Sequence, residues 1–178
     1  MTTAHVFIAT SLDGFIARPD HSLDWLASAA PEDEDHGYDA FIAKIDGIVM
    51  GRATFQAVLG FTPWPYDRPV RVISRSLTPD AVPQALRASV RILSGRPADV
   101  LATVAAEGWR RAYVDGGRLI QSFLADGLID DLTLTRVPIL IGAGRPLFGA
   151  LPRDIPLIHE TTRTFASGLV QSRYRVAA

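Results

Sequence analysis

Cysteine is absent from the 178-residue chain. Disulfide bonds, a thiolate zinc site and a cysteine nucleophile are therefore excluded. The only four histidines, His5, His21, His36 and His159, do not have the spacing of metal ligands. The Gly-x-Ser-x-Gly motif of serine hydrolases is missing as well. We therefore expect neither a metal site nor a hydrolase.

Net charge and long apolar runs are also scarce. The formal net charge is −1 and Lys44 is the only lysine, so no basic excess points to a nucleic-acid partner. The apolar stretch Val6–Ala9 is too short for a signal peptide or a membrane span, which predicts a cytoplasmic protein without a membrane partner. With 48% hydrophobic and 21% charged residues, the composition is that of one globular domain over residues 1–178.

Short β-branched runs alternate with helical patterns, which predicts an α/β fold. Expected strands are His5–Thr10, Gly47–Met50, Val70–Ser74, Val90–Leu93, Arg111–Val114 and Leu132–Leu140. Expected helices are Tyr38–Ile45, one that opens with Gly51–Phe55, Pro97–Glu107 and Arg118–Asp126, and residues 18–35 read as a long loop. Pro138 inside Leu132–Leu140 predicts an edge position or a bulge. Ile155–Thr164 and Gly168–Val176 complete a mixed, mostly parallel sheet of about eight strands with an antiparallel hairpin.

Two strand-to-helix junctions contain glycine. Gly51 follows the strand Gly47–Met50, and Gly116-Gly117 follow the strand Arg111–Val114. A helix N-terminus offers unpaired backbone N–H groups, and glycine lets an anion approach the backbone closely. Together the junctions would hold the two phosphates of a dinucleotide. The alternative is that these glycines only make tight turns, because the G-x-G-x-x-G pattern is absent.

A third polar group ends the strand Val70–Ser74, where Ser74 is followed by Arg75. In α/β sheets, ligands bind beyond the carboxyl ends of the strands. The two hydroxyls of Ser74 and Ser76 and the guanidinium of Arg75 suit a phosphate monoester such as the 2′-phosphate of NADP. The alternative is an ordinary polar strand end with a solvated arginine.

In this order, five segments resemble the signature blocks of the dihydrofolate reductase superfamily. These are Ala9–Ala17, Leu23–Trp25, Met50–Phe55, Val72–Arg75 and Val114–Gly117. The ending Ile139–Phe148 is similar to the C-terminal reductase domain of the bifunctional riboflavin-biosynthesis deaminase-reductases. The chain thus resembles a stand-alone bacterial member of that branch, from about residue 5 to the C-terminus.

The resemblance implies a three-layer dihydrofolate reductase-like fold and an NADPH-dependent oxidoreductase. Hydride would pass to a C=N or C=O of a small pterin-, pyrimidine- or sugar-amine-like substrate, as in a 5-amino-6-(5-phosphoribosylamino)uracil reductase. The implied cofactor-binding residues are Ala9, Ile16, Gly51, Arg52, Thr54, Ser74, Arg75, Val114, Gly116, Gly117, Arg118 and Leu119. Arg68 matches an arginine that, in folate reductases, holds a carboxylate of the substrate.

The proton donor stays open, because folate reductases place an acid shortly after the tryptophan and this chain does not. Asp24 and Trp25 are the expected catalytic pair, with Glu32 and Asp33 as the other candidate donors. Alternatively, Asp24 is only a turn or helix cap and Trp25 a core residue. Without a donor, the chain would be a non-catalytic NADPH- or pterin-binding module, and a true dihydrofolate reductase is the second enzymatic alternative. The apolar strand Leu132–Leu140 and the terminal hairpin predict a homodimer.

Overall fold

The computed structural model describes residues 1–27 and 34–177. The strands are β1 (Thr3–Ser11), β2 (Phe15–Ala17), β3 (Gly47–Gly51), β4 (Val70–Ile73), β5 (Val90–Leu93), β6 (Arg111–Asp115), β7 (Asp131–Val137), β8 (Arg145–Pro146), β9 (Leu157–Thr164) and β10 (Val170–Val176). The helices are α1 (Asp24–Ala27), α2 (Tyr38–Ile42), α3 (Arg52–Val58), α4 (Pro97–Ala106) and α5 (Gly117–Ala125). Two short 3₁₀ turns, Pro79–Ala81 and Gln84–Leu86, lie between β4 and β5.

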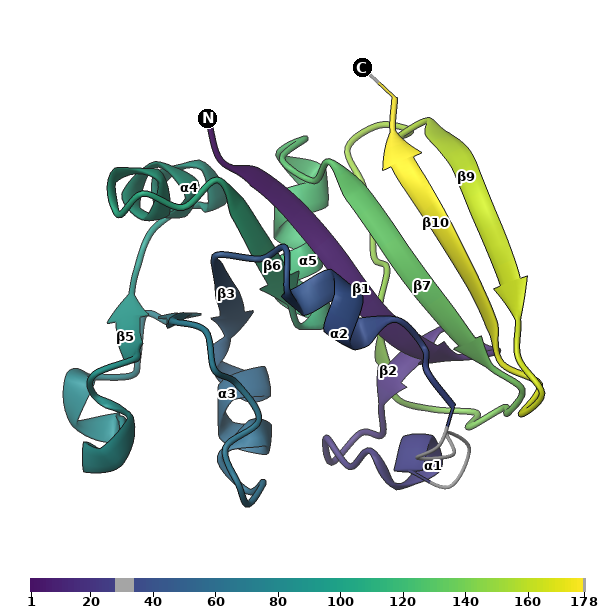
Figure 1. Cartoon of the computed structure of the whole chain (residues 1–178), viewed down its shortest axis with the longest axis horizontal. Coiled ribbons are helices and arrows are strands. Elements are labelled where there is room, and N and C mark those ends of the chain that lie inside the picture. The colour runs from purple at the N-terminus through teal and green to yellow at the C-terminus, as the bar shows by residue number, and fades with distance from the viewer. Residues whose placement is uncertain (28–33, 178) are drawn as a thin grey trace.

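Eight strands form one twisted sheet in the order β5-β4-β3-β6-β1-β7-β10-β9. The strands from β5 to β7 are parallel, and β10 pairs antiparallel with both β7 and β9. The helix α2 lies on one face of the sheet and α5 on the other, as Figure 1 shows. This is the predicted three-layer fold, in which a mostly parallel sheet with a C-terminal antiparallel hairpin lies between two layers of helices.

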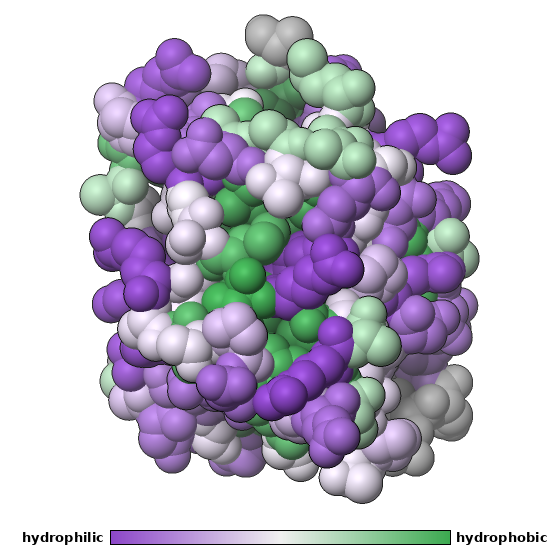
Figure 2. All heavy atoms as spheres, turned by 90° about the vertical axis from the view of Figure 1, so that its left-hand side faces the viewer, coloured by the Kyte–Doolittle hydropathy of each residue, from purple (hydrophilic) through white to green (hydrophobic). Residues whose placement is uncertain are grey.

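The apolar cores lie on the two faces of this sheet. On the face covered by α5, Ile120 and Phe123 are buried against β1 and β6. On the face covered by α2, the aromatic rings of that helix pack on Phe7 and Tyr113. On the side of the molecule that carries β5, hydrophobic residues reach the surface in a central recessed strip framed by hydrophilic residues (Figure 2). No helix among the described residues is both long and apolar enough to cross a membrane.

The predicted strand Leu132–Leu140 is wrong in its extent and in its place. The strand β7 ends at Val137, one residue before Pro138, because proline has no N–H for the ladder. It lies between β1 and β10 rather than at an edge. The irregularity in pairing falls instead at Arg173 and Tyr174 of β10. The helix expected to reach Ile45 ends at Ile42.

Candidate active site

Both glycine junctions lie side by side at the carboxyl edge of the sheet, because β3 and β6 are paired neighbours. Gly116 has φ 99°, a conformation that side chains disfavour. A Cβ atom there would collide with the hydroxyl of Thr54 and lie 3.8 Å from the backbone N of Gly51. The two junctions, together called the glycine cradle, are therefore packed directly against each other, and this contact requires that residue 116 has no side chain.

Three more of the expected cofactor residues line this junction. A Cβ on Gly117 would lie 2.9 Å from the Ile16 side chain and 2.9 Å from the Pro146 carbonyl oxygen. The side chain of Leu119 lies within 3.9 Å of the Cβ position at Gly51. The short strands β2 and β8 thus fold over the start of α5 and leave room there for backbone only.

The other residues expected around the cofactor occupy different environments. Val114 is fully buried in the core, so it shapes the junction through its backbone. Ala9 is half-buried on β1, and Arg118 is exposed at the first turn of α5.

A polar cluster sits where β4 ends. The Ser74 hydroxyl accepts hydrogen bonds from the backbone N–H groups of Ser76 and Leu77, at 3.2 and 3.0 Å. Arg52 donates to the Ser76 hydroxyl at 2.9 Å, and the Arg75 side chain is exposed beside them. Two guanidinium groups and two hydroxyl groups therefore gather at one strand end, a donor set that suits a phosphate dianion. Ser76 is the second hydroxyl of the polar strand end noted in the sequence.

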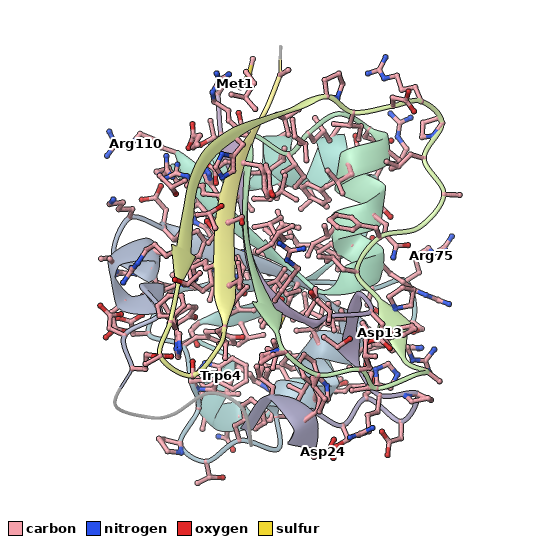
Figure 3. The ribbon with its side chains drawn as sticks, turned by 90° about the vertical axis from the view of Figure 1, so that its right-hand side faces the viewer. Met1, Asp13, Asp24, Trp64, Arg75 and Arg110 are labelled. Atoms are coloured by element: carbon pink, nitrogen blue, oxygen red, sulfur yellow. The ribbon has the colours of Figure 1, made fainter. Side chains whose placement is uncertain are left out.

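Asp24 does not have the environment of a general acid. Its side chain is 58% exposed and accepts hydrogen bonds from Arg18 Nε at 2.6 Å and from the Ser22 hydroxyl at 3.0 Å. These bonds favour the carboxylate and hold the pKa of Asp24 below its usual range. Asp24 begins α1 at the lower end of the molecule (Figure 3). Its expected catalytic role stays a prediction that this geometry does not favour.

Trp25 has the environment of a core residue. The Trp25 side chain is 1% exposed and packs with Val137 and Leu169. Glu32 and Asp33 lie outside the described residues.

Asp115, the last residue of β6, differs from Asp24 because its pKa is raised, whereas that of Asp24 is lowered. It directly precedes the Gly116-Gly117 turn and pairs in register with Met50 of β3. Burial raises the pKa of Asp115 to about 6, although the Gly116 N–H and the nearby Tyr113 hydroxyl offset part of that effect. A carboxyl group that keeps its proton close to neutral pH is what acid catalysis requires.

Three tyrosines share the electrostatic environment of Asp115. Burial, followed by the charge of Asp115, raises the pKa of Tyr38 to about 12 and also raises the pKa of Tyr66 and of Tyr113. The Tyr113 hydroxyl donates to the Phe7 carbonyl at 2.9 Å, so it is held in place beside the carboxyl. All three phenols stay neutral over the physiological range and offer hydroxyl groups rather than charges.

The segment between α3 and β4 carries two buried donors without an acceptor among the described residues, Trp64 Nε1 and Arg68 Nε. Trp64 packs edge-on against Phe55 and Tyr66. Arg68 approaches only Asp67, at 3.8 Å. Figure 3 shows Trp64 and Arg75 on opposite sides of the view, so the aromatic segment and the expected 2′-phosphate site are separate. Buried donors without partners are costly and are commonly satisfied by a ligand or by water.

The model of the RibD C-terminal domain family matches residues 3–171. The chain belongs to this family. The protein YwjB of Bacillus subtilis (strain 168) is 32% identical over 172 residues, which are 95% of each chain. The crystal structure of a putative riboflavin biosynthesis protein from Shewanella sp. PV-4 has 41% identity and a TM-score of 0.92, and the match covers 99% of this chain and 100% of that one.

More distantly, the fold is that of dihydrofolate reductase. The enzyme from Enterococcus faecalis, solved with NADP(H) bound, has a TM-score of 0.66 at 17% identity, covering 99% of this chain and 97% of that one. At this identity the likeness concerns the fold alone. The expected superfamily and its riboflavin-related branch are thereby confirmed.

Asp115 is the residue that sequence reasoning missed in this RibD-type domain. It lies inside the Val114–Gly117 block, where the aspartate reads as part of a turn. Its position as the last residue of a central strand, directly before the glycine pair, is the signal that could have identified it. No group of three or more His, Cys, Asp and Glu side chains among residues 1–27 and 34–177 is arranged to hold a metal ion.

Proposed function

We propose that this member of the RibD C-terminal domain family is an NADPH-dependent reductase. It reduces a C=N or C=O of a small pterin-, pyrimidine- or sugar-amine-like substrate. The observation that carries the proposal is Asp115, a carboxyl with a pKa of about 6 placed directly against the glycine cradle at the carboxyl edge of the sheet. A protonatable group and a set of backbone N–H groups for a dinucleotide cofactor, at one edge of the sheet, are the two elements that hydride transfer with protonation needs.

The residues present fit NADPH. The close packing of Gly116 on Thr54 and Gly51 brings two helix-starting backbones and a hydroxyl together for the shared phosphates, and Gly117 packs equally closely under Ile16. Arg52 and the Ser74–Ser76 segment supply the charge and hydroxyl groups for the 2′-phosphate. When bound, NADPH would supply the hydride. The protein binds and orients it, and keeps water away from the nicotinamide side.

Protonation falls to Asp115. Its carboxyl holds a proton up to a pH of about 6, and the Tyr113 hydroxyl lies next to it. A neutral acid beside a substrate nitrogen or oxygen donates the proton as hydride arrives at the neighbouring carbon. Above its pKa the carboxylate cannot donate, so the reaction becomes slower with rising pH.

On the substrate side, the buried donors of Trp64 and Arg68 call for acceptors. A substrate heterocycle with ring carbonyl groups would supply these acceptors, and so would a substrate carboxylate or phosphate bound by Arg68. This requirement favours a carbonyl-bearing pyrimidine or pterin over an apolar substrate.

The test is oxidation of NADPH, followed by absorbance, with a panel of pterins, folates and ribosylaminopyrimidines. Turnover with any one of them supports a reductase. NADPH at about a hundred times its dissociation constant should stabilise the fold by about 2.7 kcal/mol and raise the melting temperature by several degrees. A melting temperature that NADPH leaves unchanged contradicts the cofactor assignment. Stabilisation without turnover on the whole panel indicates a non-catalytic NADPH-binding module.

We further propose a homodimer, now on the evidence of β9 rather than β7. All eight residues of β9 are exposed, and no strand among the described residues pairs with one edge of it. Leu157 and Ile158 are each 43% exposed on it. An open edge with apolar side chains suits pairing with the same strand of a second copy. Light scattering at micromolar concentration tests this: Ile158→Lys should shift a dimeric mass towards the monomer, and a monomeric wild type contradicts it.

A further inference from the structure

A pocket of about 200 Å³ lies on the α2 side of the sheet, between α2 and the strands β7, β10 and β9. Four cationic side chains line it: Lys44, Arg111, Arg163 and Arg173. The single acidic residue of the lining is Asp131. The pocket is therefore strongly positive in a chain whose net charge is −1.

Much of this positive charge lacks an ion-pair partner among the described residues, although the charge of Arg111 helps to lower the pKa of Asp131. Arg173 is paired with Asp131 at 3.3 Å and with Glu160 at 3.1 Å. Among the described residues, no carboxylate lies within ion-pair distance of Lys44, Arg111 or Arg163. Three cations that converge on one concave surface repel one another, and an anion between them removes that repulsion.

Arg111 gives the strongest indication that the pocket binds an anion. Its Nε is buried and has no hydrogen-bond acceptor among the described residues. Its terminal nitrogen lies 3.3 Å from His5 Nδ1, but that ring nitrogen is only 2.8 Å from the Asp131 carboxylate. When Nδ1 carries a proton towards the carboxylate it cannot also accept one from Arg111. The guanidinium is thus left with donors that a bound anion would satisfy.

The pocket is separate from the proposed active site. Arg111 begins β6 and Asp115 ends it, about 13 Å away along an extended strand. Figure 3 shows the neighbouring Arg110 at the opposite end of the molecule from Asp24 and Trp64. The Phe41 ring of α2 lies between the two sites, because it lines the pocket and also packs against Tyr113 with 5.1 Å between ring centroids.

We propose that this pocket, lined by Lys44, Arg111, Arg163 and Arg173, is a binding site for a small phosphate-bearing anion. Its volume is below the roughly 300–1,000 Å³ of pockets for drug-sized ligands, so it suits a phosphate monoester or pyrophosphate rather than a dinucleotide. The rings of Phe7 and Phe41 close one side, and the cations supply charge-assisted donors. The site does not depend on the proposed reductase activity.

Calorimetric titration of the whole chain with inorganic pyrophosphate, with sodium chloride added to keep the ionic strength constant, tests the proposal. The variants are Lys44→Gln, Arg163→Gln and the double variant, and Arg91→Gln is the matched control. Arg91 is an exposed arginine on β5, the other edge strand, as Arg163 is on β9. Each single change in the pocket should weaken binding roughly three- to tenfold, because one partly exposed charge is lost. The double variant should lose one binding site per chain, and Arg91→Gln should titrate like the wild type.

Pyrophosphate binding that all variants retain unchanged overturns the proposal, since it would come from the glycine junctions. Absence of binding in the wild type overturns it too. If the double variant does not fold, the pyrophosphate affinities of the two single variants test the proposal in the same way. The wild type could also fail to bind pyrophosphate while the double variant has a different molecular mass in light scattering. That result would mean that these cations bind a second copy of the chain instead of an anion. NADPH stabilisation and NADPH oxidation should be the same in the double variant and in the wild type, so this result and the test of the reductase activity are distinguishable.

Discussion

Replacing Asp115 by Asn should make the protein more stable and almost inactive. Burial raises the pKa of the carboxyl from 3.8 to about 6, so ionised Asp115 is less favourable in the folded chain than in the unfolded one. The wild type is therefore penalised progressively as pH rises from about 4 to about 6, and fully above that range. Asparagine keeps the carbonyl acceptor and cannot ionise.

The size of the gain follows from the pKa. The raised value corresponds to at most about 3 kcal/mol, and because Asp115 keeps some contact with water we expect roughly 1–3 kcal/mol at pH 8. In a chain of this length that is roughly 2–10 °C of melting temperature. At pH 4, close to the ordinary pKa of 3.8, most of the gain should disappear, because the wild-type carboxyl is then protonated in the fold.

Activity should move in the other direction. Loss of a general acid lowers turnover by about 10²–10⁴-fold, and binding of NADPH should change little. In the wild type, kcat/KM should fall as pH rises above about 6, and this dependence should be missing from the residual activity of Asp115→Asn. The assays are thermal denaturation at pH 4 and pH 8 and NADPH oxidation between pH 5 and pH 9.

Asp126→Asn is the control, since Asp126 is an exposed aspartate at the end of α5 and far from this edge of the sheet. It should change neither stability nor rate. The reasoning is refuted if Asp115→Asn gains no stability at pH 8, or if the variant keeps wild-type turnover. A wild-type rate that stays flat up to pH 9 would also remove Asp115 as the acid.

Three further variants test the neighbouring groups. Arg75→Ala should weaken NADPH roughly ten- to a hundredfold and leave NADH nearly unchanged, and equal losses for both cofactors in thermal-shift titrations would remove the 2′-phosphate assignment. Asp24→Asn should keep most of the turnover, because its carboxylate is exposed and ion-paired, and a hundredfold loss would restore it as the donor. Gly116→Ala should lower both NADPH affinity and the free energy of unfolding, because its Cβ meets Thr54, whereas Gly14→Ala has the same strained sign of φ but open space and should affect only stability. Matching losses of NADPH affinity in both glycine variants would refute the cradle.

The glycine junctions were predictable because their cause is local. A glycine that follows an apolar run and opens a helix is visible in the residue order, and its positive φ at Gly116 has a steric reason. Pro138 carried the signal for the end of the strand at Val137, but the prediction ran on to Leu140, and the position of that strand inside the sheet had no local signal. Strand order depends on which distant segment pairs with which, and no local pattern encodes it.

The chemistry of the carboxyl groups was the part that the sequence could not give. Asp24 looked suitable by its neighbour Trp25, yet the ion pair with Arg18 forms only when the loop folds back. Asp115 has a raised pKa because tertiary packing removes water from it, and nothing in the residue order records that. The cationic pocket is similar, since Lys44, Arg111, Arg163 and Arg173 come from four separate segments in a chain of nearly balanced charge.

Within the eight-stranded sheet, the first strand of the chain waits longest for its first neighbour to be synthesised. Thr3 pairs with Arg111 of β6, and His5 pairs with Asp131 of β7, so β1 has no partner until more than a hundred further residues exist. During synthesis its apolar side chains, such as the fully buried Val6, stay without a core for most of that time. The hairpin of β9 and β10, by contrast, closes within a few residues. We expect folding to be limited by the capture of β1, and newly made chains to depend on protection of their first strand from aggregation until that step is complete.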